Sequence, residues 1–143
     1  MALPSPAPGL VISYSYLWHC PRGGRNGRPQ GSPCAIVLTA ADEEGDLRVY
    51  VVPVTHSAPS DDPHAVELPP SVKRRLGLDD APSWIVTNEL NRFVWPGYDL
   101  RPVARSKPDT LAWGFLPENV FSAVKRRIAA HQRTGRLKLN GRE

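Results

Sequence analysis

Short apolar runs, separated by prolines and polar turns, occupy most of the chain up to residue 116. Runs of this length suit strands, which need only about five or six residues, whereas a helix needs several uninterrupted turns. Apolar residues bounded by turn residues predict strands at positions 10–18, 34–39, 47–54, 66–68, 84–87, 91–95 and 100–103. The pattern therefore predicts a mainly β domain.

One segment near the end of the chain has helical periodicity instead. Apolar residues recur there at spacings of three and four and form one stripe: Val120, Phe121, Val124 and Ile128. Because proline is tolerated in the first helical turn, we expect this helix to begin at Pro117 and to continue to about His131. A shorter helical stretch, closed by a glycine, is expected at residues 69–77. From Gly135 onward we expect a frayed tail.

The composition agrees with this interpretation. The chain has 143 residues, which fits one domain, and 16 of them are proline. An interior proline removes a backbone hydrogen bond from a helix and clashes with the preceding turn, so a helical bundle is excluded. We expect a Pro-rich leader at residues 1–8, a single domain at residues 9–132 and a basic tail at residues 133–143.

Positive charge is concentrated toward the end of the chain. Residues 1–109 carry 11 basic and 12 acidic groups, whereas residues 110–143 carry 7 basic and 2 acidic groups. This excess suits contact with a polyanion or with an acidic partner, although a solvated helix face has the same composition.

The sequence also indicates the cellular compartment in which the protein is expected. The two cysteines, Cys20 and Cys34, allow one disulfide at most. The first residues have neither the basic nor the apolar part of a secretion signal, and no apolar run has the length of a membrane span. We therefore expect a reduced cytoplasmic protein that does not contact a membrane.

Several kinds of catalytic site are not supported. The histidines and cysteines lack the short paired spacing of a metal site, and no nucleophile elbow is present. Glycines cluster within residues 23–31, but a strand follows them in place of the helix that a phosphate-binding loop requires. We expect neither a metal nor a cofactor.

A group of cationic and polar side chains is the remaining candidate site. Three arginines fall in a long predicted loop at residues 21–33, which has no aliphatic residue: Arg22, Arg25 and Arg28. Two strand segments add polar groups: Thr55 with His56, and Asn91 with Arg92. Arginine offers paired donors to phosphate, and a threonine hydroxyl can donate to a nonbridging oxygen. This set suits a phosphodiester substrate, and the alternative is solvated arginines beside a strand end.

Four segments of the chain form a recognisable series. They are Pro8-Gly9-Leu10-Val11, Ser32-Pro33-Cys34-Ala35-Ile36-Val37-Leu38, Val51-Val52-Pro53-Val54-Thr55-His56-Ser57 and Trp84-Ile85-Val86-Thr87-Asn88-Glu89-Leu90-Asn91-Arg92. In this order, and with the closing helix, they resemble the PemK/MazF-like toxins of type II toxin–antitoxin systems over roughly residues 8–128. The resemblance implies a small SH3-like β-barrel of the PemK/MazF/CcdB type with a C-terminal α-helix. It also implies a homodimer, a cognate antitoxin as protein partner, and metal-independent cleavage of single-stranded RNA.

The resemblance assigns roles to individual residues. Thr55 corresponds to the family's threonine after a Pro-hydrophobic pair, and Arg92 to an arginine in the later strand. The family's other arginine stands directly before the proline that opens the second strand, where this chain has Ser32. Arg28, which itself precedes Pro29, is the nearest replacement. The alternative is a chain that has lost this group and binds RNA more than it cuts it.

We therefore predict an endoribonuclease in which Arg28, Thr55 and Arg92 act on the phosphodiester bond during attack by the 2′-hydroxyl. Five further residues are predicted to contact the substrate: Arg22, Arg25, His56, Asn91 and Trp95. Two other classes of protein remain as alternatives. One is a non-catalytic binding protein on the same barrel, either a degenerate toxin or a CcdB-like topoisomerase inhibitor, and the other is an unrelated nucleic-acid-binding β-barrel.

Overall fold

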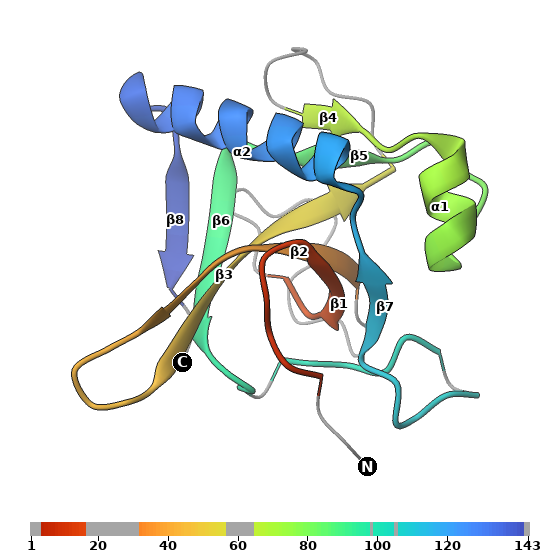
Figure 1. Cartoon of the computed structure of the whole chain (residues 1–143), viewed down its shortest axis with the longest axis horizontal. Coiled ribbons are helices and arrows are strands. Elements are labelled where there is room, and N and C mark those ends of the chain that lie inside the picture. Colours follow the sequence, from red (N-terminus) through yellow and green to blue (C-terminus); the bar gives the residue numbers. More distant parts are fainter. Residues whose placement is uncertain (1–3, 17–31, 57–64, 98, 105, 142–143) are drawn as a thin grey trace.

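The computed structural model describes residues 4–16, 32–56, 65–97, 99–104 and 106–141. Within these residues the fold is mainly β, with two helices (Figure 1). In chain order the elements are β1 (Leu10–Tyr14), β2 (Ser32–Ala41), β3 (Leu47–Thr55), β4 (Ala65–Glu67), α1 (Pro70–Leu76), β5 (Trp84–Val86), β6 (Glu89–Val94), β7 (Ala112–Phe115), α2 (Glu118–Arg133) and β8 (Lys138–Gly141).

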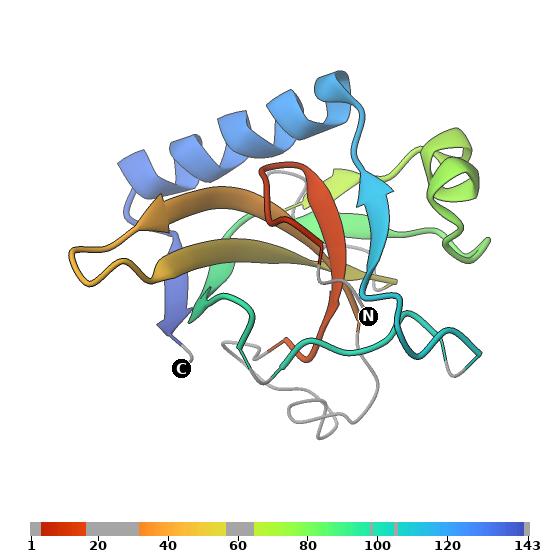
Figure 2. The same ribbon diagram turned by 60° about the horizontal axis from the view of Figure 1, so that its bottom comes forward.

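The strands form one sheet with the order β4-β5-β3-β2-β1-β7, while β6 pairs with β3 and with β8. The pairs are antiparallel except for β6 with β8, which is parallel. The strands β4 and β7 end the path, and the described strand pairs do not join them, so the sheet is open. Helix α2 lies across one face of this sheet, and α1 lies near β7 (Figures 1 and 2).

Strand β3 is the centre of the sheet. One of its edges pairs with β2, whereas the other pairs with β6 at residues 48–51 and with β5 at Val54 and Thr55. Because side chains alternate along a strand, the odd and even positions of β3 face opposite sides of the sheet. Val49 and Val51 accordingly belong to one apolar cluster, and Val52 belongs to the other.

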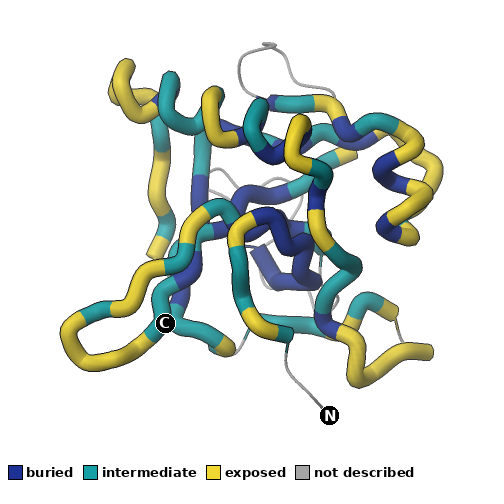
Figure 3. The backbone as a smooth tube through the Cα atoms, viewed as in Figure 1, coloured by how far each residue is buried: buried dark blue, intermediate teal, exposed yellow. Residues whose placement is uncertain are grey.

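The two clusters cover the two faces of the sheet. The helix-side core lies beneath α2 and α1 and consists of Val11, Ala35, Val52, Leu68, Val72, Leu76, Ile85, Leu90, Leu116, Val120, Phe121 and Val124. The aromatic core lies on the other face and consists of Leu10, Ile12, Tyr14, Tyr16, Cys34, Ile36, Val49, Val51 and Phe93. Figure 3 shows that burial is deepest along β1 and the adjoining strands and lowest at the tip of the β2–β3 hairpin.

The hairpin tip is built by one carboxylate. Oδ1 of Asp42 accepts hydrogen bonds from the backbone N–H groups of Glu44 and Asp46, each at 3.0 Å. Gly45 has a φ of 86°, a conformation that a residue with a Cβ adopts only at a cost. These contacts explain why the acidic turn after residue 41 reverses the chain.

Much of the secondary structure follows the predicted pattern. The segments that become β2, β3, β4, β5, β6 and α1 were each predicted to within a few residues, and the apolar stripe after Pro117 forms α2. Helix α2 is not the last element, because β8 follows it. The first strand is shorter than predicted and ends at Tyr14, and residues 17–18 lie outside the described part of the chain.

Two predictions about secondary structure were wrong, and one strand was missed. Residues 100–103 form no strand but only an isolated bridge between Leu100 and Tyr14, since Pro102 has no N–H for a ladder. The strand β7 was missed because Gly114, next to a register shift against β1, weakens the strand pattern. The expected frayed tail contains β8, which pairs with β6. Its sequence, Lys-Leu-Asn-Gly, has no apolar pattern that would predict a strand, because the pairing is made by backbone hydrogen bonds.

No helix in the described part of the chain is long and apolar enough to cross a bilayer.

The aromatic core makes a testable contribution to stability. Phe93 is 1% exposed and its ring stacks on that of Tyr14 with the ring centroids 4.6 Å apart. Phe93→Ala should lower the free energy of unfolding by about 3–5 kcal/mol, through lost burial and the cavity left behind. Phe115 is 54% exposed, so Phe115→Ala should change it by about 0.5 kcal/mol or less. Urea denaturation measures both, and equal effects would contradict this assignment of the core.

Candidate functional site

The end of β3 carries two of the predicted site residues. Thr55 is partly exposed and pairs with Trp84 of β5, and His56 follows it as an exposed residue. Both residues are therefore accessible at the edge of the sheet where the chain leaves β3.

The start of β2 lies beside this strand end. Strands β2 and β3 pair at Cys34 with Pro53 and at Ala35 with Val52. Continued for two residues, the same register brings Ser32 level with Thr55. Ser32 is also the partner of Tyr14 in β1, so the chain on both sides of residues 17–31 is anchored in the sheet near Thr55.

Three predicted site residues lie outside the described residues, namely Arg22, Arg25 and Arg28. All three belong to the segment that joins β1 to β2. That segment enters β2 at Ser32, the residue level with Thr55.

Arg92 does not share a site with Thr55. It is the partner of Tyr50, an even position of β3, whereas Thr55 is an odd position, so their side chains leave opposite faces of the sheet. Tyr50 and Thr55 are also five residues apart, or about 16 Å along a strand. The Arg92 guanidinium lies over β8, since a Cβ added to Gly141 would stand 3.1 Å from its Nη2 atom.

Asn91 and Trp95 are on the same side of the sheet as Thr55, but the fold uses them differently. Asn91 is completely buried opposite Val51. Trp95 is partly buried and packs against the aromatic core, with its ring centroid 6.1 Å from that of Phe93. Asn91 therefore has no surface to offer a substrate, and Trp95 keeps only part of its ring accessible.

A network of charged groups at His56 was not predicted. Nε2 of His56 lies 3.2 Å from Oδ1 and 3.0 Å from Oδ2 of Asp79. Nζ of Lys73, on α1, donates to the same Oδ1 at 2.9 Å and to Oγ of Ser83 at 2.7 Å. It also donates to the backbone carbonyl of Ala81. These contacts connect α1, the loop at residues 77–83 and the end of β3.

Lys73 is the unusual member of this network, because its side chain is only 5% exposed. Burial of an ammonium group is costly unless each of its donors has a partner, and here Asp79, Ala81 and Ser83 supply three. Local structure places it there: Pro70 begins α1, and Gly77, with a φ of 81°, ends it and turns the chain back over the helix.

This arrangement lowers the pKa of Asp79. The hydrogen bond from Lys73 holds the pKa of the Asp79 carboxyl below its ordinary value of 3.8; burial opposes this shift, and the charges of His56 and Lys73 add to it. Asp79 also accepts a hydrogen bond from the N–H of Ala81 at 3.2 Å. Its orientation is therefore set by several donors.

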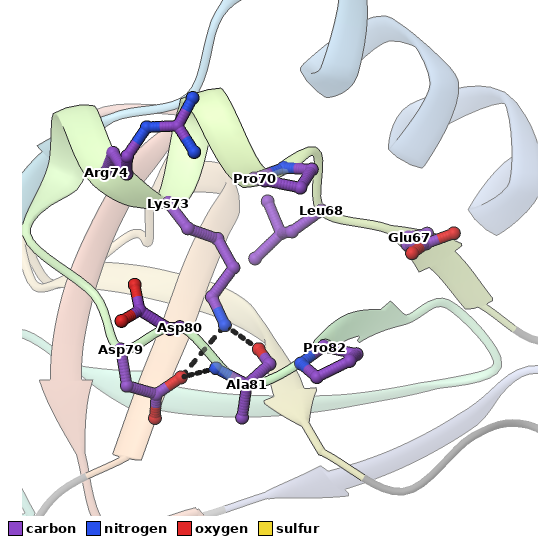
Figure 4. A pocket seen from close by; sticks show the side chains of 9 residues that line it. All are labelled: Glu67, Leu68, Pro70, Lys73, Arg74, Asp79, Asp80, Ala81 and Pro82. Atoms are coloured by element: carbon purple, nitrogen blue, oxygen red, sulfur yellow. Dashed lines mark hydrogen bonds and ion pairs between the residues drawn. The ribbon is translucent and has the colours of Figure 1, made fainter.

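A pocket of about 340 Å³ opens beside the network (Figure 4). It is lined by Glu67, Leu68, Pro70, Lys73, Arg74, Asp79, Asp80, Ala81 and Pro82. Figure 4 shows the Lys73 side chain descending from α1 to the loop that carries Asp79 and Ala81. The sequence offered one signal of this network, a lysine between the buried residues Val72 and Leu76 of a short helix.

Two other titratable side chains are packed into the aromatic core. Burial, reinforced by the nearby Glu89 carboxylate, raises the pKa of Tyr16, whose hydroxyl donates to Oε1 of Glu89 at 3.2 Å. Burial also raises the pKa of the free thiol of Cys34. Both groups are held uncharged in the core, as structural residues are.

Among the residues that the structure describes, no three His, Cys, Asp or Glu side chains are grouped so that they could hold a metal ion. No protein-family model matches the chain, and no curated protein is significantly similar to it.

The Lys73–Asp79 contact predicts a pH dependence of stability. Because the folded-state pKa of Asp79 lies below 3.8, the contact stabilises the fold fully at neutral pH and is lost as the pH falls through 3.8 and then through the lower folded value. Asp79→Asn should therefore be less stable than the wild type at pH 7, and the difference should shrink toward pH 3.

Urea denaturation across this pH range measures the effect. Asp80→Asn is the matched control, because it neutralises the neighbouring carboxylate and leaves the contacts of Asp79 intact. A wild-type advantage over Asp79→Asn that stays constant from pH 7 to pH 3 would contradict the assignment.

Proposed function

We propose that the protein is the toxin of a type II toxin–antitoxin system and acts as a metal-independent endoribonuclease on single-stranded RNA. The observation that carries the proposal is the register of β2 against β3, which pairs Cys34 with Pro53, two residues from both Ser32, where the arginine-bearing segment enters β2, and the partly exposed Thr55. The order of the four segments that resemble PemK/MazF-like toxins agrees with it.

The finer description of the fold belongs to the same proposal. A mainly antiparallel sheet crossed on one face by α2 agrees with a small SH3-like barrel of the PemK/MazF/CcdB type with a helix near its end, although the described strand pairs leave this sheet open. In this description the aromatic core fills the barrel interior and the helix-side core fills the space beneath α2.

The reaction assigned to the site is a transesterification within RNA. The 2′-hydroxyl loses its proton, its oxygen forms a bond to the adjacent phosphorus, and the bond from phosphorus to the 5′-oxygen breaks. The 5′-oxygen takes up a proton, so the products are a 2′,3′-cyclic phosphate and a 5′-hydroxyl. Donors that stabilise the charge on the phosphate accelerate such a step without a metal.

Thr55 and Arg28 are the residues assigned to this step. The Thr55 hydroxyl would donate to a nonbridging oxygen, and the Arg28 guanidinium would stabilise the phosphate and the departing oxygen. Arg28 precedes Ser32 by four residues, a separation that spans at most about 14 Å. Arg92, which lies on the other face and over β8, is left out of the catalytic set and is assigned a structural role.

The expected partners are a second copy of the chain and a cognate antitoxin. Large apolar side chains are exposed on three strands, at Leu38, Phe115 and Leu139, and such positions suit protein contacts. The basic groups on and after α2 suit an acidic antitoxin or general attraction of RNA.

Ser32 favours a second candidate function. Its place before Pro33 is where the resemblance expects an arginine, and a hydroxyl cannot supply the same charge. On this alternative the chain is a degenerate toxin that binds RNA without cutting it. A topoisomerase inhibitor resembling CcdB is the less favoured form of the same idea.

Cleavage of single-stranded RNA by the purified protein in the presence of EDTA tests the proposal. The wild type should release fragments with 2′,3′-cyclic phosphate and 5′-hydroxyl ends. Thr55→Val, which removes the donor and keeps the β-branched shape, should lower kcat about 100-fold, as should Arg28→Ala. Arg92→Ala should cut at close to the wild-type rate.

Two variants serve as controls. Thr39→Val removes a hydroxyl from β2 away from the site, and Lys107→Ala removes an exposed charge from the segment before β7, so both should cut normally. RNA binding without cleavage by the wild type would establish the degenerate alternative, and absence of both would refute the proposal. Wild-type rates for Thr55→Val would remove the role of Thr55.

A further inference from the structure

His56 is held in a way that differs from an ordinary surface histidine. Its Nε2 atom lies within 3.2 Å of both oxygens of Asp79, yet its side chain is 58% exposed. A carboxylate only accepts hydrogen bonds, so Nε2 carries the proton in the neutral ring. The lone pair is thereby assigned to Nδ1, on a ring that stays accessible to a ligand.

An exposed ion pair by itself orients a side chain weakly, because both partners are free to move. Here the carboxylate is fixed from behind. The buried Lys73 ammonium and the N–H of Ala81 both donate to Oδ1 of Asp79, and Ser83 in turn accepts from Lys73. Buried groups therefore fix the Asp79 carboxylate, and the carboxylate in turn fixes the exposed imidazole of His56.

The network is also tied to the strand end that carries the proposed site. Ser83 is followed directly by Trp84, the β5 residue that pairs with Thr55. His56 is the residue after Thr55, so their Cα atoms are about 3.8 Å apart. Consecutive side chains of an extended chain point to opposite faces, so a nucleotide can meet both residues only across the end of β3, where the strand leaves the sheet. There the 2′-hydroxyl would face His56 and the adjacent phosphate would face Thr55.

We propose that His56 is the general base of the RNA cleavage and that Asp79 and Lys73 are positioning residues for it. This inference rests on the proposed ribonuclease function and adds to it a proton acceptor, which neither Thr55 nor a guanidinium provides.

Nδ1 of His56 accepts the proton of the 2′-hydroxyl as the bond from the 2′-oxygen to phosphorus forms, and the bond from phosphorus to the 5′-oxygen breaks. Water donates the proton that the 5′-oxygen takes up, and the imidazolium afterwards returns its proton to the hydroxide so formed. No metal, oxidant or other co-reactant is needed.

The test compares His56→Ala, Asp79→Asn and the control Asp80→Asn on single-stranded RNA in EDTA. His56→Ala should lower kcat about 100-fold or more, and added imidazole should restore part of the rate. Asp79→Asn should lower kcat about 10-fold with KM unchanged, as expected for a residue that acts through another. Asp80→Asn should match the wild type.

A spectroscopic measurement separates positioning from a general loss of structure. In ¹⁵N NMR of the full chain, the wild type should hold His56 in the Nε2-protonated tautomer, and Asp79→Asn should redistribute the tautomers while the rest of the spectrum stays folded. Lys73→Met should have the same effect on the tautomer if its thermal unfolding remains cooperative.

The outcomes distinguish this inference from the function on which it rests. A wild type that does not cleave RNA refutes the ribonuclease and with it the role of His56. Cleavage by the wild type that persists at the same rate in His56→Ala refutes only the base assignment. An unchanged rate and an unchanged tautomer in Asp79→Asn refute the positioning role.

Discussion

The alternation of side chains along β3 is the constraint on which the rest of the molecule depends. This strand has partners on both edges, so neither its register nor its faces can change without breaking pairs to β2, β5 and β6. Its odd positions fill the aromatic core and its even positions pack toward α2. The same alternation decides which polar side chains can meet, and it separates Thr55 from Arg92.

A second constraint comes from one buried cation. An ammonium group inside a protein is tolerated only where oxygen atoms surround it, and Lys73 obtains them from the loop that follows its own helix. That loop must therefore fold back over α1, and in doing so it brings Asp79 to the end of β3. The need to pair the buried Lys73 ammonium therefore also orients the Asp79 carboxylate beside the accessible His56.

The two constraints meet at the location of the proposed site. Strand β3 carries Thr55 and His56 to the edge of the sheet, and the Lys73 network supplies a fixed partner there. The arginine-bearing segment enters β2 level with the same edge. Rigid paired strands position a side chain more precisely than loops do, which is why the proposed site is centred on Thr55 at the end of β3.

Several features were predictable from sequence because they depend on local patterning. Short apolar runs between prolines predicted most of the strands, and apolar residues at spacings of three and four predicted α2. Thr55 and His56 were predicted as site residues because they follow the strongest predicted strand. The strands β7 and β8 were not found, since Gly114 interrupts one pattern and backbone pairing alone defines the other.

What the sequence determined by itself is the mainly β class, the position of α2 and the group of residue types that suits a phosphodiester. Only the tertiary structure decided which of those residues share a face. Arg92 and Asn91 are neighbours in the same predicted strand, yet one lies over β8 and the other is buried. The physical reason is that strand pairing and burial act between segments far apart in the chain, and the charge of Lys73 finds its partners only after the loop has closed on it.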